Sequence, residues 1–181
     1  MDVVSHGLWA GAAAKAANKQ RVEKVSVLKT AAWGLFPDVF AFGPAFAWLF
    51  YLIATGALSF SEFPGVHHVG EPASGNSLPA LQLASALYNF SHSIIMFALV
   101  FLLAWLIMQR PVWEMGGWLL HIIMDIPTHS YAFFPTPVFW PLFGWKFNGI
   151  NWATLWFMIF NYSALVLAYW LLREKKKDTH A

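Results

Sequence analysis

A long stretch without basic residues constrains this chain more than any other feature. From Thr30 to Gln109 the sequence contains no Lys or Arg, and its only acidic residues are Asp38, Glu62 and Glu71. A soluble domain needs charged side chains over roughly a quarter to a third of its surface, and this stretch cannot supply them. Over the whole chain, 59% of the residues are hydrophobic and 11% are charged, whereas soluble domains average about 45–50% and about 25%. The sequence therefore predicts an integral membrane protein.

We expect an all-α, polytopic membrane protein with about four transmembrane helices and a short N-terminal helix. A helix of about 20 apolar residues crosses the hydrocarbon core, and the candidate spans are residues 39–58, 83–108, 112–126 and 151–172. We expect Pro127 to end the third span, because the residue before a proline is disfavoured in the α conformation. The aromatic and proline-rich segment 128–148 is expected to lie at the membrane interface or to re-enter the membrane.

The basic residues lie mainly towards the two ends of the chain, in the polar segment 18–29 and in the tail 173–181. The positive-inside rule then places both termini in the cytoplasm, with four crossings by parity. This distribution disfavours a nucleic-acid-binding face, and the absence of cysteine excludes thiolate metal sites. We expect residues 1–181 to form a single integral membrane domain in contact with the lipid bilayer.

Ionisable residues within or beside the apolar segments mark a candidate site, because each costs a few kcal/mol to place in a bilayer. They are His6, Asp38, His92, His121 and Asp125, with His129 close behind. His121 and Asp125 are four residues apart and share one helix face. Imidazoles and carboxylates together suit Zn²⁺ best, or Mn²⁺ or Fe²⁺. A water bound to such an ion loses a proton near neutral pH and can attack an ester, with His129 as a candidate proton shuttle.

Each of these residues also has a structural interpretation. His121 and Asp125 could be a hydrogen-bonded pair that locks two helices, and His92 could pack between helices. Asp38 could cap a helix, and His6 could be solvated near the terminus. A polar loop explains a further group of residues better than a second metal site does; these are Glu62, His67, His68 and Glu71.

Five motifs follow one another between about residues 6 and 147: Ser5-His6-Gly7-Leu8, Gly34-Leu-Phe-Pro-Asp38, Asn89-Phe-Ser-His92-Ser93, Leu120-His121-Ile-Ile-Met-Asp125-Ile-Pro-Thr128, and Phe139-Trp-Pro141 with Trp145-Lys-Phe147. In these motifs and their order the chain resembles the YdjM-like family of bacterial inner-membrane, metal-dependent hydrolases. The resemblance implies a multi-pass protein of the inner membrane whose catalytic metal is bound by His6, Asp38, His92, His121 and Asp125.

The order His, Asp, His and His-x-x-x-Asp is also similar to that of the zinc-dependent phospholipase C and single-strand nuclease superfamily. This similarity implies two metal ions. His6 and Asp125 would hold the second ion, and Asp125 would also bind the first ion. The remaining ligands of the first would be Asp38, His92 and His121. From a site inside the membrane, we expect the substrate to be a lipid or lipid-linked phosphoester reached from the bilayer.

The chain departs from the YdjM-like pattern in two places. Val39 and Phe40 stand where the family usually has Asp-His, and Tyr88 and Asn89 stand where it has His-Arg. The missing Arg would be the natural partner of a phosphate group. Two other functions therefore stay open. One is an intramembrane transporter of metal ions or protons, which so few spans could form only as an oligomer. The other is a non-catalytic structural or regulatory membrane protein.

Overall fold

The computed structural model describes residues 1–59, 79–132 and 134–173, and this part of the chain is all-helical. Its α-helices are α1 (Val3–Asn18), α2 (Val27–Ala54), α3 (Pro79–Ser91), α4 (Ile94–Met108), α5 (Gly116–Thr128) and α6 (Leu155–Leu171), and a 3-10 turn covers Trp113–Met115. The prediction of an all-α fold is confirmed over these residues. The polar group at Glu62, His67, His68 and Glu71 lies outside them.

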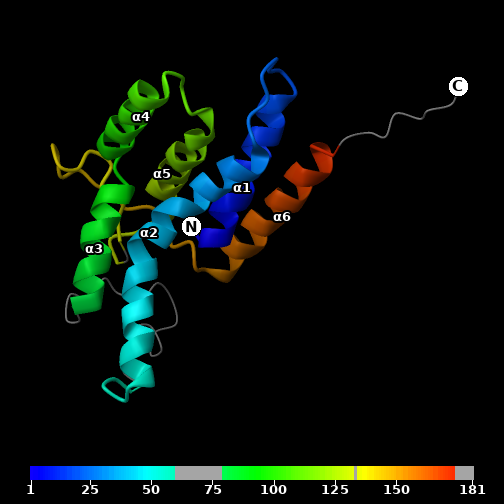
Figure 1. Ribbon diagram of the computed structural model, residues 1–181. Helices are drawn as coiled ribbons and strands as arrows, with labels where there is room; N and C mark the ends of the chain where they lie inside the picture. Colours follow the sequence, from blue (N-terminus) through cyan, green and yellow to red (C-terminus); the bar gives the residue numbers. More distant parts are fainter. Residues whose placement is uncertain (60–78, 133, 174–181) are drawn as a thin grey trace, which may run out of the picture.

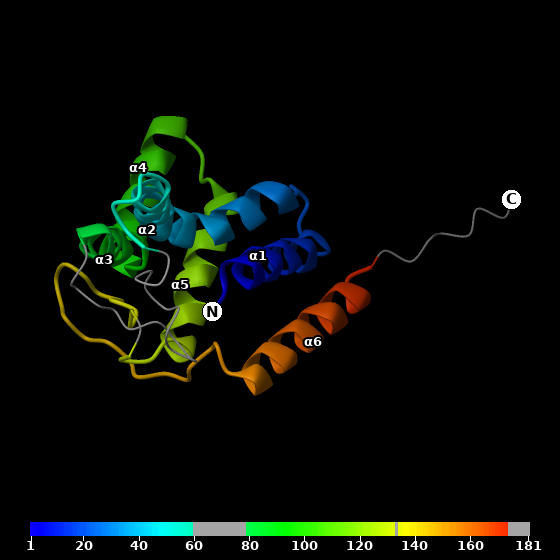
Figure 2. The ribbon, with the colours of Figure 1, turned by 90° about the horizontal axis from the view of Figure 1, so that it is seen from below.

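Helix α2 is the centre of the fold and packs against α1, α3 and α5. It begins at Val27, where the Ser26 side chain accepts a hydrogen bond from the Lys29 backbone N–H. The helix therefore starts about three helical turns before the expected residue 39. Asp38 lies well inside the helix rather than at its entrance. Pro37 and Pro44 each remove a backbone donor from the helix, and α2 bends in its middle (Figures 1 and 2).

The expected span 83–108 is broken into two helices that meet at 62°. The Ser93 side chain caps α4 by accepting hydrogen bonds from the backbone N–H groups of Ile95 and Met96. On the other side of the break, the indole N–H of Trp118 donates to the Ser91 carbonyl at 2.6 Å. The serines that flank His92 therefore fix a corner, and this corner places the imidazole inside the protein.

Glycines let α1, α2 and α5 approach each other at the distance of backbone contact. A Cβ atom added to Gly34 would lie 2.8 Å from the carbonyl oxygen of His6 on α1. One added to Gly117 on α5 would lie 2.1 Å from the carbonyl oxygen of Thr30 on α2. These two contacts draw together the helices that carry four of the candidate site residues, as both ribbon views show (Figures 1 and 2).

Among the described residues, α2 is the one helix that is both long and apolar enough to cross a membrane, and the bent pair α3–α4 would make a second span. Helix α6 is apolar but has 17 residues, and α5 has 13. Helix α5 also differs from the prediction in running two residues past Ile126, to Thr128, because Pro127 is accommodated near its C-terminal end. The four-span topology stays a prediction.

Candidate metal centre

Four buried side chains from three parts of the fold converge on one point. Asp38 comes from α2, His92 from the corner between α3 and α4, and His121 and Asp125 from α5. One ligand atom from each lies within 4.8 Å of the others, and the group could hold a metal ion. His121 Nε2 lies 3.0 Å from His92 Nε2 and 3.2 Å from Asp125 Oδ2. His92 Nε2 lies 3.5 Å from Asp38 Oδ1.

Hydrogen bonds at the far side of each ring define the tautomers of the two central histidines. His121 Nδ1 lies 2.8 Å from the Gly34 carbonyl oxygen, which can only accept, so Nδ1 carries the proton. The Ser91 hydroxyl donates to the Pro37 carbonyl and lies 2.9 Å from His92 Nδ1, so it accepts the Nδ1 proton of His92. In the neutral rings, both Nε2 atoms are therefore bare acceptors that face each other.

The convergence of these acceptors is unfavourable unless a cation lies among them. Two imidazole lone pairs and two carboxylates share a volume from which solvent is excluded, since all four residues are buried. The Oδ2 atoms of Asp38 and Asp125 have no hydrogen-bond donor among the described residues. Buried charges are costly unless they are paired or coordinate a metal, so the donor set fits a divalent ion bound by nitrogen and oxygen.

The second oxygen of Asp125 faces a separate group of residues. Its Oδ1 lies 2.9 Å from His6 Nε2, 3.3 Å from His129 Nε2 and 2.6 Å from the Met1 α-ammonium. The ring of His6 stacks on that of His121 with centroids 3.6 Å apart. Burial lowers the pKa of His6 to about 4, so this ring is neutral at pH 7 and one of its two ring nitrogens keeps a free lone pair. Asp125 thus lies between two sets of ligand atoms.

The structure brings together every residue that the sequence nominated as a metal ligand or as the proton shuttle. All of them are buried: His6, Asp38, His92, His121, Asp125 and His129. Their roles stay predictions. Sequence reasoning missed Ser91, whose place beside His92 was the available signal. It also missed the Gly34 carbonyl, because a backbone acceptor 87 residues from its donor leaves no trace in the sequence.

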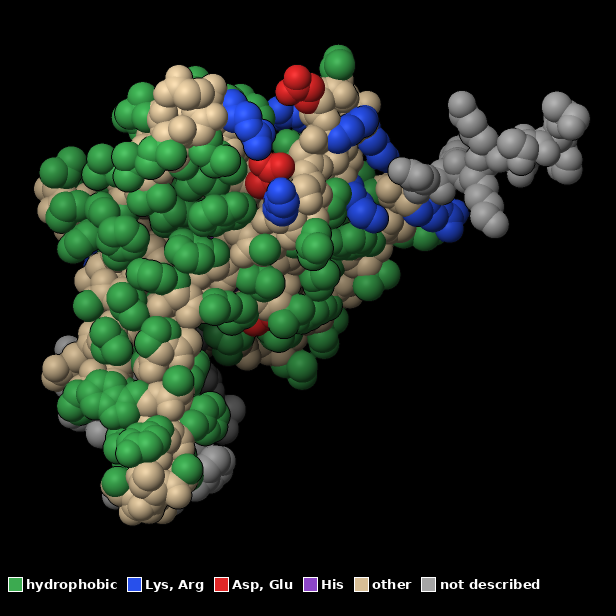
Figure 3. All heavy atoms as spheres, viewed as in Figure 1, with side chains coloured by type: hydrophobic (Ala, Val, Ile, Leu, Met, Phe, Trp, Pro, Cys, Tyr) green, Lys and Arg blue, Asp and Glu red, His purple; other side chains and the backbone are tan. Residues whose placement is uncertain are grey.

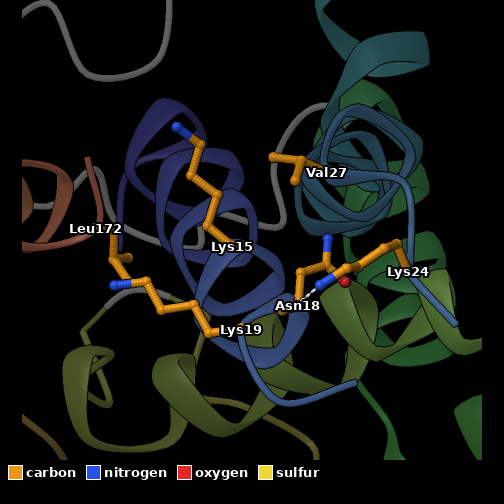
Figure 4. Close-up of a pocket in the computed structure, with 6 residues that line it drawn as sticks. All are labelled: Lys15, Asn18, Lys19, Lys24, Val27 and Leu172. Atoms are coloured by element: carbon orange, nitrogen blue, oxygen red, sulfur yellow. Dashed lines mark hydrogen bonds between the residues drawn. The ribbon is translucent and has the colours of Figure 1, made fainter. Parts of the chain in front are cut away.

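A cavity of about 440 Å³ lies elsewhere, between the ends of α1 and α6 and the start of α2. It is lined by Lys15, Lys19 and Lys24; the Lys24 amine lies beside Asn18 and the Lys19 amine beside Leu172 (Figure 4). Lys24 donates to the Asn18 carbonyl, and Lys19 to the Leu171 carbonyl at 3.4 Å. Lys19 and Lys24 satisfy carbonyls at helix ends and Lys15 lies over the ring of Tyr169, so the metal centre is the better candidate for the functional site.

The chain gives no match when it is compared with protein-family models, with curated proteins or with solved structures. Its resemblance to the YdjM-like family therefore stays a prediction.

Proposed function

We propose that this chain is a membrane-embedded, metal-dependent hydrolase. The observation that carries the proposal is the convergence of two bare imidazole nitrogens and two carboxylates on one buried point. Zn²⁺ is the first candidate, with Mn²⁺ or Fe²⁺ as alternatives, because all three accept mixed nitrogen and oxygen ligands. An ion held there polarises an ester oxygen and makes a coordinated water acidic enough to react at neutral pH.

Asp125 and His129 are the residues that we assign to the reaction itself. Asp125 would hold the ion through Oδ2, which lies 3.2 Å from His121 Nε2, and its Oδ1 lies 3.3 Å from His129 Nε2. His129 lies at the C-terminal end of α5, where it can take a proton from the attacking water and return it to the leaving group. A second ion beside Oδ1, with His6 as ligand and in the place that the Met1 α-ammonium takes in the structure, would complete a two-metal arrangement of the kind that clamps both oxygens of a phosphoryl displacement.

The exposed surface supports a lipid environment and a lipid or lipid-linked phosphoester as substrate. Apolar side chains cover most of the face in Figure 3, and Lys and Arg gather at one end, near the α1–α2 connection and the end of α6. Large exposed side chains such as Ile107, Leu155 and Phe160 would otherwise lie in water. We infer an inner-membrane protein with this basic end in the cytoplasm.

A proton relay is the second candidate function, and one distance favours it. The Nε2 atoms of His92 and His121 are 3.0 Å apart, which is a hydrogen-bond distance if one of them is protonated. A shared proton could then replace the ion and pass between the carboxylates. The chain would in that case move protons and bind no tight metal.

Metal analysis of the detergent-purified protein tests the two functions directly. We expect about one or two molar equivalents of a transition metal in the wild type, and a loss of metal in His121→Ala and in Asp125→Ala. Glu23→Ala removes an exposed carboxylate and is the matched control, which should keep its metal. A folded wild-type protein that stays empty after metal is added would contradict the hydrolase and favour the relay.

A further inference from the structure

A second cavity, of about 260 Å³, adjoins the metal centre. Two of its lining residues, Asp38 and His129, belong to the site described above. Most of the remaining lining is apolar and includes Val3, Phe42, Phe46 and Trp152. A ligand in this cavity would therefore touch the metal-binding residues at one point and hydrocarbon over the rest of its surface.

One hydrogen-bond donor in the lining of this cavity has no acceptor among the described residues. The carboxylate of Asp2 is already engaged, because it accepts hydrogen bonds from the Ser5 backbone N–H and the Tyr162 hydroxyl, both at 3.0 Å. The indole Nε1–H of Trp152 is buried and finds no acceptor among the described residues. A buried donor without an acceptor is destabilising, so a ligand that brings an oxygen atom to Trp152 would relieve this cost.

We propose that this cavity binds the alkyl chain of an amphiphilic ester, and that Trp152 donates a hydrogen bond to an oxygen of its polar head. Because Asp38 and His129 line one part of the cavity, the polar head of the substrate would lie towards the metal centre and its alkyl chain against the apolar lining. The apolar lining favours such a chain over a small water-soluble ester, since each buried methylene strengthens binding about fourfold. The assignment of the cavity as a substrate pocket rests on the proposed hydrolase function, whereas the binding of an alkyl chain in the cavity does not.

Photolabelling of the metal-free protein tests whether the cavity binds an alkyl chain when no metal is present. The probe is 1-decanol that carries a diazirine on its terminal carbon. Val3→Trp fills the cavity, and Val4→Trp is the matched control, because Val4 is exposed next to Val3 and is not part of the lining. We expect labelling of the peptides that contain Phe42 and Phe46 in the wild type and in Val4→Trp, and its loss in Val3→Trp. Equal labelling of the two variants would overturn the proposal.

Hydroxamates with alkyl chains of different length test whether the alkyl-chain cavity and the metal centre bind one ligand together. Calorimetry measures their binding to the zinc-loaded protein. Octanohydroxamate should bind more tightly than acetohydroxamate by about fourfold per buried methylene. Val3→Trp should lose this gain and Val4→Trp should keep it, in the same detergent. Trp152→Phe, which lacks the indole donor, should weaken octanohydroxamate about tenfold.

The two proposals fail in different ways in this experiment. No binding of acetohydroxamate by any variant would contradict the metal site and leave the photolabelling result standing. Binding of acetohydroxamate with the same chain-length gain in Val3→Trp and Val4→Trp would contradict the alkyl-chain pocket and leave the metal site standing.

Discussion

At the scale of single residues, the protonation of two histidines depends on groups that never touch the proposed ion. The Gly34 carbonyl and the Ser91 hydroxyl hold the Nδ1 protons of His121 and His92, and both Nε2 atoms are left as ligands. Such partners fix the ring orientation of metal-binding histidines and raise their basicity. Of these two groups, the Ser91 hydroxyl belongs to a side chain, so a mutation can remove it without changing the backbone.

Ser91→Ala should lower metal affinity about 10- to 100-fold, because His92 loses the acceptor that orients its ring. A competition titration with a chromogenic chelator measures this change. Ser93→Ala is the control from the other side of His92: it removes the cap of α4 and should cost about 1 kcal/mol of stability, with the affinity unchanged. An equal loss of affinity in both variants would mean that the corner as a whole, and not the His92–Ser91 contact, supports the site.

The candidate ligands could be predicted from the sequence because ionisable residues in an apolar context have few explanations. His121 and Asp125 were further linked by their spacing on one helix face. Their second contacts could not be predicted in the same way. The Ser91 hydroxyl reaches Pro37, 54 residues away, and only the packing of α3 on α2 brings the two together.

At the scale of elements, the site depends on how closely α5 can approach α2. Gly117 lies against the backbone of Thr30, and the next residues of α5 carry His121 and Asp125 towards Asp38. Any side chain at position 117 must push the two helices apart. The geometry of the ligands and the stability of the fold are therefore coupled through this contact.

Gly117→Ala should destabilise the protein by about 3 kcal/mol or more, because its Cβ meets backbone atoms that cannot move aside. The same variant should lose metal affinity, since α5 carries two of the ligands. Gly116→Ala is the matched control: its Cβ meets nothing within 4 Å, and it should stay within about 1 kcal/mol of the wild type. Thermal unfolding in detergent compares the two variants, and similar melting temperatures would contradict the role given to the α2–α5 contact.

The element boundaries were harder to predict than the elements. Apolar composition indicated helices at 39–58 and 83–108, but it could not show that α2 begins as early as Val27, because residues 27–38 include Lys29 and Pro37 and are still helical. The break at Ser93 depends on a side-chain cap and on contacts with segment 138–140. Neither changes the hydropathy of the segment.

At the scale of the whole molecule, the open question is which surfaces face lipid and which face water. Exposed apolar side chains lie along α4 and α6, whereas most of the Lys and Arg side chains visible in Figure 3 gather at one end of the protein. A membrane would accommodate both features if the basic end lies in the cytoplasm. The chain contains no cysteine, so single cysteines can be introduced to test this orientation.

Glu23→Cys and Arg110→Cys should react with a membrane-impermeant maleimide only from the cytoplasmic side. Lys146→Cys should react only from the opposite side, because it lies in the segment between the third and fourth expected spans. All three positions are exposed. Labelling of intact spheroplasts and of inverted vesicles gives the two patterns. Reaction of Lys146→Cys from the same side as Glu23→Cys would contradict the four-span topology.

The crowding of unprotonated acceptors at the metal centre has a consequence for the amount of protein in the cell. An ion that binds the folded state alone stabilises it by about 4 kcal/mol when its free concentration is a thousand times the dissociation constant. Chains that fold without an ion lack this stabilisation and are exposed to proteolysis more often. If the proposed site binds its ion, the half-life of the protein should therefore lengthen as the supply of that metal rises and shorten when the cell is starved of it.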